Sequence, residues 1–462
     1  MCEKTSKMNI SKYCSLEDKR LETRLETLLE QMDMQTNTSV NNLAISNHQK
    51  KAYYRFINNS KVYSENLMLG YQQFSINEAI SSSNVILSLQ DTTELDFTGN
   101  RSAKNLDCLE YKYRKGIYLH NHLLTSDLGV PFGVFSQNFY AYKAENLGKS
   151  RERRYAPISE KHSYRWITEF ESLQTAFKDA TDKTVISISD RESDIHELLE
   201  ARKYDHVHYI VRSSRDRKLE NEVNSMWQTV GNEAVCFTYD VRVPCKKNRN
   251  EHRTATIAVR YTKVCIKPSY RKGKTISPVD LWIVDATEIS APLNEKAICW
   301  RLLTSMAVDS AAIAEKIIGY YVLRWVIERF HYVLKQGNKV EDLQIQAPEA
   351  LKNAIILQSW IAIKVCALAY QNKTEPQTTL EEMGYEQQDY QIAYVYVKTK
   401  INKKIIKVEK PTLYDFSTLI AQIGGSNLQK NRHLGVVSLW KGWNKFLIIR
   451  ETWIMQKDVG NQ

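Results

Sequence analysis

The pattern of hydrophobic and polar positions predicts a helical N-terminal region. Leucines recur at roughly helical spacing in LEDKRLETRLETLLEQM (16–32). A polar segment (33–47) interrupts this pattern, and HQKKAYYRFINNSKV (48–62) then predicts a second helix that an Asn-Asn-Ser turn ends. Residues 1–75 are therefore expected to form a helical N-terminal domain.

From residue 84 the pattern becomes typical of strands. An apolar run at 84–95 turns polar at its end, and 115–142 predicts two strands of a hairpin around Leu128-Gly129. The segment 184–202 predicts a buried strand that leads into an amphipathic helix, and the strand HVHYIVRSS follows it. This order predicts an α/β fold in which helices pack on a mixed sheet.

The rest of the chain divides into a strand-rich and a helical part. Residues at about 205–305 alternate apolar and polar positions between basic turns, which predicts an antiparallel β subdomain inserted into the core. Helical patterns return at 310–337 and 346–371, and the tail has a Gly424-Gly425 break. We therefore predict a core at 76–372 and a helical C-terminal region at 373–462.

Composition supports a folded protein without disulfides or membrane spans. Hydrophobic residues make up 43% and charged residues 25% of the 462 residues, which excludes a disordered chain or a small disulfide scaffold. Eight scattered cysteines form no C-x-x-C pair and are expected to be reduced. The N-terminus has no apolar signal region, and polar residues interrupt the most apolar segment, 353–370. A cytoplasmic protein with no membrane partner is expected.

Positive charge gathers in three stretches of the chain. The net charge is 64 − 53 = +11, and Lys/Arg outnumber acids ten to one in 245–274, eight to two in 398–432 and twelve to six in 101–165. Such stretches favour a polyanion such as a nucleic-acid backbone. For any one stretch, a solvated loop remains the alternative.

Three acidic residues stand out by their position. Asp91 follows the apolar run 84–90, and Asp190 follows the apolar run 184–189, just before a helix. Strand ends of open sheets are common places for functional groups. Glu328 lies in the helical segment 318–337. Carboxylates that converge from different elements suit two divalent cations about 3.5–4 Å apart, as in phosphodiester cleavage.

The helical segment 318–337 also places donors beside Glu328. At about 100° per residue, Tyr321, Arg324, Glu328 and Lys335 share one narrow face, opposite an apolar stripe. Arg offers a planar fork for phosphate, and Lys offers a point charge. The alternatives are ordinary: an Asp at a strand end often caps a turn or helix, and Arg324 with Glu328 could be a surface i,i+4 pair.

The spacing Tyr321-x2-Arg324-x3-Glu328-x6-Lys335 resembles the Y-(2)-R-(3)-E-(6)-K signature of DDE transposases in the insertion-sequence-four group, which includes the transposon-five transposase. QDTTELDFTG (90–99) and SDRESDIHELL (189–199) resemble the segments around the first and second Asp of this group. Their separation (190 − 91 = 99) and the 138 residues from Asp190 to Glu328 (328 − 190) also match, with room for the β insertion.

Further segments extend the resemblance over nearly the whole chain. LEDKRLETRL (16–25) and KKAYYRFINNSKV (50–62) resemble the end-recognition region, where Arg20 would face DNA. IVRSSRDRK (210–218) implies a DNA contact by Arg212, and AICWRLLTS (297–305) implies that Trp300 stacks on a flipped base. LWKGW (439–443) resembles the C-terminal dimer region.

The resemblance implies a cut-and-paste transposase with a ribonuclease-H-like core. Asp91, Asp190 and Glu328 would hold two Mg²⁺ or Mn²⁺ ions, while Tyr321, Arg324 and Lys335 would hold phosphates. The enzyme would nick transposon end DNA, form and reopen a hairpin, and join the 3′-OH to target DNA as a homodimer. The alternatives are a catalytically silent DNA-binding regulator, a metal-dependent nuclease without strand transfer, and a basic structural protein.

Overall fold

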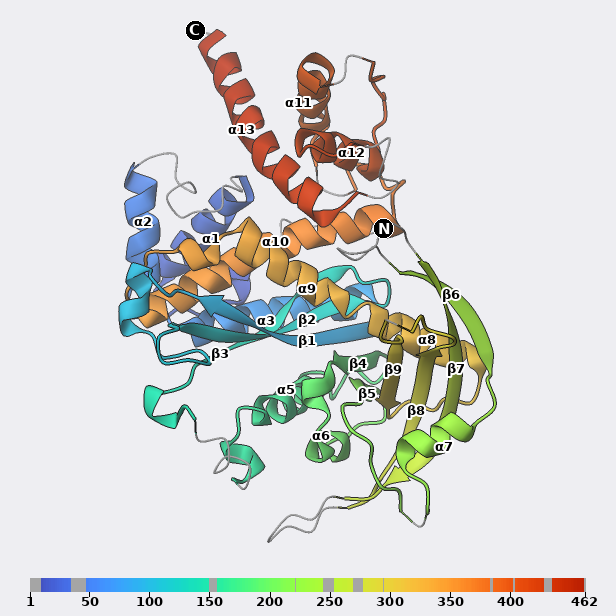
Figure 1. Ribbon diagram of the computed structural model, residues 1–462. Helices are drawn as coiled ribbons and strands as arrows, with labels where there is room; N and C mark the ends of the chain where they lie inside the picture. Colours follow the sequence, from blue (N-terminus) through green and yellow to red (C-terminus); the bar gives the residue numbers. More distant parts are fainter. Residues whose placement is uncertain are drawn as a thin grey trace. The chain divides into compact units, whose positions relative to one another are not determined.

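The computed structural model describes most of the chain and divides it into two compact units. Described are residues 10–34, 47–148, 156–220, 222–243, 253–268, 277–293, 295–382, 385–401, 404–427 and 434–460. The first unit comprises residues 1–81, 92–149 and 326–462, and the second comprises 82–91 and 150–325. Figure 1 shows the elements by label.

A large mixed sheet accounts for the strands of the described residues. Their order is β3-β2-β1-β4-β5-β9-β8-β7-β6. β1 (Val85–Asp96), β4 (Thr184–Ser189) and β5 (Val207–Arg212) run parallel, and the pairings from β5 through β9 to β6 are antiparallel. The predicted α/β class with a mixed sheet is therefore confirmed.

In the second unit, buried apolar residues explain the parallel strands. β4 (TVISIS) and β5 (VHYIVR) are buried along most of their length, as expected where helices cover parallel strands. The helices α5 (Tyr164–Ala176) and α6 (His196–Glu200) pack against each other beside these strands (Figure 1). One expectation was wrong: β1 continues to Asp96, so Asp91 lies within the strand and not at its end.

The predicted β insertion extends the sheet of the second unit. Its strands are β6 (Phe237–Val243), β7 (Arg253–Ile266), β8 (Val279–Glu288) and β9 (Cys299–Thr304), and β9 pairs with β5. The short helix α7 (Met226–Asn232), which the sequence pattern did not predict, packs against β7 and β8. Helix α8 (Ala311–Val322) follows β9. The right-hand side of Figure 1 shows these strands as a curved sheet.

The first unit begins with three helices. α1 (Lys19–Met34) and α2 (Asn47–Ile57) confirm the two predicted helices, and α1 buries Leu25, Leu28 and Leu29 on one face. The third helix, α3 (Ser64–Ser82), was not singled out in advance, and the predicted domain boundary at residues 75 and 76 falls inside it.

A hairpin and a long core helix form the centre of the first unit. β2 (Gly116–Ser126) and β3 (Pro131–Tyr140) are antiparallel around a turn with Gly129 at φ 84°, which confirms the predicted hairpin. Helix α3 lies close to β3: Ser75 Oγ donates to the Val134 carbonyl at 2.9 Å, and a Cβ at Gly133 would clash with Ser75. A side chain at position 133 would force the helix away.

Helix α10 (Pro348–Thr374) is a long, largely apolar helix of the first unit. By length and composition it could cross a membrane, but 89% of its most apolar window is buried inside the protein, which is typical of a core helix. Asn353 Nδ2 donates to the carbonyls of Ile57 (3.1 Å) and Val62 (2.9 Å), and so ties α10 to the end of α2.

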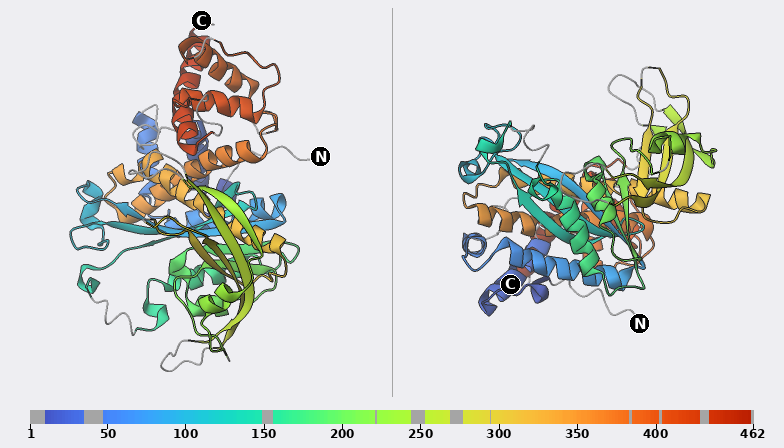
Figure 2. Two further views of the ribbon diagram at one scale, coloured as in Figure 1. Left: turned by 45° about the vertical axis from the view of Figure 1, so that its right-hand side comes forward. Right: turned by 90° about the horizontal axis from the view of Figure 1, so that it is seen from below.

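The C-terminal segment of the first unit is helical, as the sequence predicted. Its helices are α11 (Gln387–Tyr396), α12 (Leu413–Ile423) and α13 (Val436–Gly460). Gly424 ends α12 and lets α13 approach closely, because a Cβ there would meet the Ser438 carbonyl oxygen at 2.0 Å. Figure 2 shows these helices as one group.

Two expectations depend partly on residues outside the described ranges. The six described cysteines are free thiols, whereas Cys2 and Cys245 lie outside. Parts of the three basic stretches also lie outside the described residues. These parts are 245–252 and 269–274 of the first stretch, 402–403 and 428–432 of the second, and 149–155 of the third.

Candidate active site

The β1–β4 pairing brings the segments that lead to two predicted catalytic residues side by side. The parallel register pairs Val85 with Thr184 and holds the same offset (184 − 85 = 99) through Leu89 and Ile188. Asp91 and Asp190 have this same offset and lie two residues beyond the last of these pairs, Asp91 within β1 and Asp190 directly after the end of β4. Both residues are partly buried.

Asp190 also caps a turn, which was the alternative to a catalytic role for an Asp at a strand end. Its Oδ1 accepts a hydrogen bond from the Glu192 amide at 2.9 Å and caps the short 3-10 turn Arg191–Ser193. Ser193 Oγ donates to the Asp190 carbonyl at 2.8 Å. The cap fixes the side-chain direction of Asp190, and a role as a ligand remains compatible with it, because a carboxylate has further lone pairs.

The Asp91 carboxylate forms an ion pair with Arg324, one of the residues predicted to bind phosphate. Arg324 Nη1 lies 3.1 Å from Asp91 Oδ2, and both side chains are largely buried, with 13% and 20% exposed. Both residues belong to the second unit. The guanidinium therefore compensates a carboxylate charge that would be costly to bury alone.

Tyr321, Trp300 and Arg212 belong to the same neighbourhood of the second unit. The Tyr321 ring meets the Trp300 ring edge to face, with centroids 5.6 Å apart. Burial raises the pKa of Tyr321, and the positive charges of Arg324 and Arg212 partly offset this rise. Arg212 Nη2 donates to the Cys299 carbonyl at 2.9 Å and so holds β5 against β9.

The prediction of one continuous helix over residues 318–337 was wrong. α8 ends at Val322, and α9 (Trp325–Tyr332) begins after a turn in which the Arg324 amide bonds to the Tyr321 carbonyl at 3.1 Å. A π-helical turn (Val333–Gly337) follows. Because both irregularities change the angle per residue, a single 100° projection does not apply to this segment.

Glu328 and Lys335 belong to the first unit. Glu328 is partly buried in α9. Lys335 lies in the π-helical turn, where its Nζ donates to the Glu94 carbonyl at 2.7 Å and pairs with Glu341 at 3.3 Å. Lys335 is therefore held by partners within its own unit.

Asp91 and Asp190 could hold a hard divalent cation, because both are partly buried carboxylates that lie close to the point where the β1–β4 pairing ends. Among the described residues, no group of three or more His, Cys, Asp or Glu side chains is gathered closely enough to hold a metal. A cation at Asp91 would compete with the Arg324 guanidinium for the same carboxylate.

Arg20 lies far along the chain from these residues, at the start of α1. Its side chain is 91% exposed and pairs with Asp18 at 3.0 Å, which raises the pKa of Arg20. In the region of α1 and α2, the exposed basic residues are Lys12, Lys19, Arg20, Lys51, Arg55 and Lys61.

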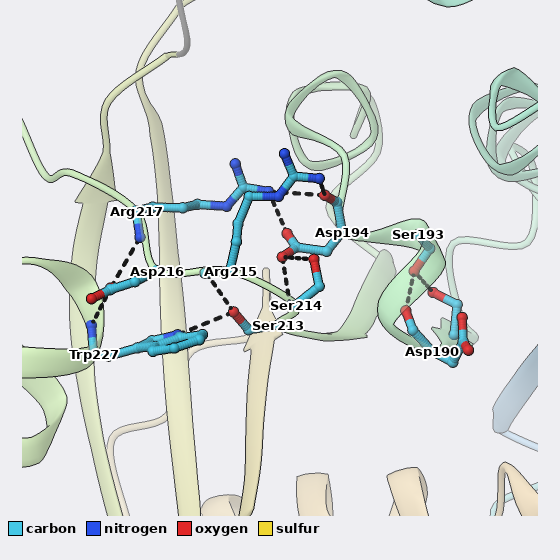
Figure 3. Close-up of polar contacts among 10 residues, drawn as sticks. Asp190, Ser193, Asp194, Ser213, Ser214, Arg215, Asp216, Arg217 and Trp227 are labelled. Atoms are coloured by element: carbon cyan, nitrogen blue, oxygen red, sulfur yellow. Dashed lines mark hydrogen bonds and ion pairs between the residues drawn. The ribbon is translucent and has the colours of Figure 1, made fainter. Parts of the chain in front are cut away.

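Two buried charged residues near Asp190 were missed at the level of the sequence. Asp194 and Arg217 form an ion pair with 0% and 5% of their side chains exposed. Figure 3 shows this pair beside the turn that carries Asp190. The signal was available in SDRESD (189–194) and SSRDR (213–217), but alternating charges in loops are more often solvated.

A comparison with models of protein families indicates the class of protein to which the N-terminal region is similar. Residues 9–62, which include α1 and α2, match a protein-family model described as transposase DNA-binding. The chain therefore carries a transposase-type DNA-binding region, and DNA is the class of partner that this match supports.

A comparison of folds adds one particular protein. The chain is similar to a piggyBac transposase, solved by cryo-EM as a synaptic complex with hairpin DNA, at 11% identity and a TM-score of 0.32. The match covers 65% of this chain and spans about half (51%) of the piggyBac chain.

Proposed function

We propose that the protein is a cut-and-paste DNA transposase of the DDE type with a ribonuclease-H-like core, similar to the insertion-sequence-four group. It would bind transposon end DNA, cleave it through a hairpin intermediate and join the 3′-OH to target DNA. A homodimer that uses the C-terminal region would pair the two ends.

The parallel β1–β4 register, which runs to within two residues of both Asp91 and Asp190, is the observation that carries this proposal. Backbone hydrogen bonds between the two strands hold the segments that carry these carboxylates side by side, as metal-assisted chemistry requires. The transposase DNA-binding match at 9–62 supports DNA as the substrate. Glu328 would be the third carboxylate, as the resemblance to the Y-(2)-R-(3)-E-(6)-K signature implies.

The other residues of the neighbourhood would bind and orient DNA. Arg324 would exchange its contact with Asp91 for a phosphate once the carboxylate has another partner. Trp300 would offer a ring face to a base, supported from the edge by Tyr321. Lys335 and Arg212 would add phosphate contacts.

Divalent cations, Mg²⁺ or Mn²⁺, would supply activation of the attacking oxygen and stabilisation of the leaving oxygen when bound by Asp91, Asp190 and Glu328. The protein's own contribution would be geometric. The β1–β4 register holds two ligands, and the cap on the Glu192 amide fixes the direction of Asp190.

One assay tests this proposal. Purified protein is incubated with the end sequence of its element and Mg²⁺, and the products are separated on a denaturing gel. We expect nicked and hairpin products that vanish in Glu328→Gln. Glu315→Gln is the matched control, because it makes the same change at an exposed residue of α8, and it should leave the products unchanged.

The same gel distinguishes the alternatives. Binding without cleavage would contradict the enzyme and favour a DNA-binding regulator, an outcome for which the Arg324–Asp91 ion pair offers a physical reason. Nicking without hairpin or joined products would favour a nuclease.

A further inference from the structure

We propose that Asp194 and Arg217 are positioning residues, which hold the turn carrying Asp190 in the conformation that binds a divalent cation. This inference rests on the proposed function, because it assigns the two residues a role through Asp190. All residues that carry it belong to the second unit.

Few hydrogen bonds within the turn after β4 fix its position. Ser189 and Ser193 share a hydrogen bond at 2.5 Å between their hydroxyl oxygens, and Ser193 Oγ also donates to the Asp190 carbonyl. The first contact ties the turn to the last residue of β4, and the second is internal to the turn. The position of the turn relative to the loop after β5 depends on further contacts.

Asp194 supplies the buried contacts of this kind, whereas the pair between Glu192 and Arg165 at 2.9 Å is exposed. Its Oδ2 accepts hydrogen bonds from the Ser214 amide at 2.7 Å and from Ser214 Oγ at 3.0 Å. Its Oδ1 pairs with Arg217 Nη2, and its carbonyl accepts from the same nitrogen at 3.0 Å. Figure 3 shows how the Asp194 carboxylate lies between Ser214 and the guanidinium groups, one turn from Asp190.

Arg217 depends on Asp194 in return. The guanidinium is buried, and its Nε meets no acceptor among the described residues, so the Asp194 carboxylate is its charge partner. Breaking one side of such a pair leaves a buried charge, which is more harmful than removing both sides. The pair therefore links the turn 190–194 to the loop 213–217.

The loop 213–217 is itself anchored to the β insertion. The Trp227 amide donates to Asp216 Oδ1 at 2.9 Å, and Trp227 Nε1 donates to Ser213 Oγ at 3.2 Å. The Arg301 guanidinium lies 4.4 Å from the Trp227 ring centroid and pairs with Asp285. Since Arg301 is adjacent to Trp300 in β9, the same chain of contacts leads to the residue proposed to stack on a base.

The test measures Mn²⁺ binding to the full-length protein by electron paramagnetic resonance, with and without end DNA, besides cleavage. Asp190→Asn identifies the binding that depends on this site. Asp194→Asn is expected to weaken that binding by about 10–100-fold, the usual effect of removing a residue that orients a ligand. The Mn²⁺ concentration for half-maximal cleavage should rise in parallel.

Two further variants separate positioning from folding. Asp194→Asn combined with Arg217→Gln removes both charges and leaves no buried charge unpaired, so it should fold and still bind Mn²⁺ weakly. Arg217→Lys keeps the charge and should recover part of the affinity. Glu288→Gln breaks a comparable buried pair with Arg253 in the same unit and should leave Mn²⁺ affinity unchanged.

The outcomes are distinct. If wild type binds Mn²⁺ and cleaves, but the folded double variant keeps wild-type Mn²⁺ affinity, the positioning role is wrong and the proposed function stands. If Glu288→Gln lowers the affinity as much as Asp194→Asn, the effect is general destabilisation and the role is also wrong. A wild type that neither binds Mn²⁺ nor cleaves overturns the proposed function and this inference together.

Discussion

Two regions of the molecule hold charge in opposite ways. In the neighbourhood of Asp91 and Asp190, charged side chains are partly or fully buried and paired, as in Arg324–Asp91 and Arg217–Asp194. In the region of α1 and α2, six basic side chains are exposed, and Arg24 and Lys50 are half-buried. Buried pairs fix geometry, whereas exposed bases can follow a flexible, screened polyanion. The first region is therefore suited to chemistry and the second to attachment.

Asp190→Asn should break this comparison most strongly. We expect cleavage to fall at least about 100-fold, because a ligand for charge stabilisation is lost, while DNA affinity stays within a few-fold. Gel assays of cleavage and of binding measure the two effects. Asp205→Asn, an exposed control in the same unit, should change neither; equal losses of cleavage and binding would show that the two regions do not divide the work.

His208 tests how burial acts in the second unit. Burial on β5, with a smaller contribution from Arg202, lowers the pKa of His208 from 6.5 to about 4. Between pH 6.5 and 4 the unfolded chain binds the extra proton, so stability should fall as the pH falls through this window, by at most about 3 kcal/mol. Denaturant unfolding of wild type and His208→Gln measures it: the variant should lose this part of the pH dependence, and identical profiles would contradict the assignment.

Lys51→Ala combined with Arg55→Ala tests the exposed region of α2. If both side chains contact phosphates, DNA affinity should fall roughly tenfold and the salt slope of binding should shrink by about 2. Fluorescence anisotropy at several salt concentrations measures both. The matched control is Lys178→Ala with Lys203→Ala, two exposed lysines of the second unit. A larger effect of the control would move the attachment surface to the second unit.

The smallest effect is expected at the Arg20–Asp18 pair. Asp18→Ala frees a highly exposed arginine from its partner and should tighten DNA binding by less than about threefold, because exposed ion pairs are weak. Arg20→Ala should weaken binding by a similar factor. The same anisotropy titration measures both, and a tenfold change in either variant would show that this pair does more than its exposure suggests.

Much of the fold was predictable because its elements depend on local patterns. The apolar runs at 84–90 and 184–189 became β1 and β4, and the turn at Leu128-Gly129 became the hairpin of β2 and β3. The break at Leu323–Arg324 and the π-helical turn at Lys335 were missed. Their residues have ordinary helical propensities, so tertiary packing and not local preference ends the regular helix.

The roles given to the site residues stay predictions, and Glu328 and Lys335 belong to the first unit. The residues Asp91, Asp190, Arg324, Tyr321, Trp300 and Arg212 were all singled out beforehand, and the structure brings them together in the second unit. The Asp194–Arg217 pair was not anticipated, because a sequence does not reveal which loop charges become buried. Only the return of the chain after β5 places residues 23 positions apart in contact.

The sequence by itself determined the spacing of the carboxylates, the excess of positive charge and the alternation of strands and helices, since each depends on residue order alone. Tertiary structure decided the rest. The pairing of β1 with β4 brings the segments that lead to Asp91 and Asp190 side by side, the turn at Arg324 points a guanidinium at Asp91, and the loop after β5 buries Arg217 on Asp194. These contacts join distant segments, and their energies depend on burial, which exists only after the chain has folded.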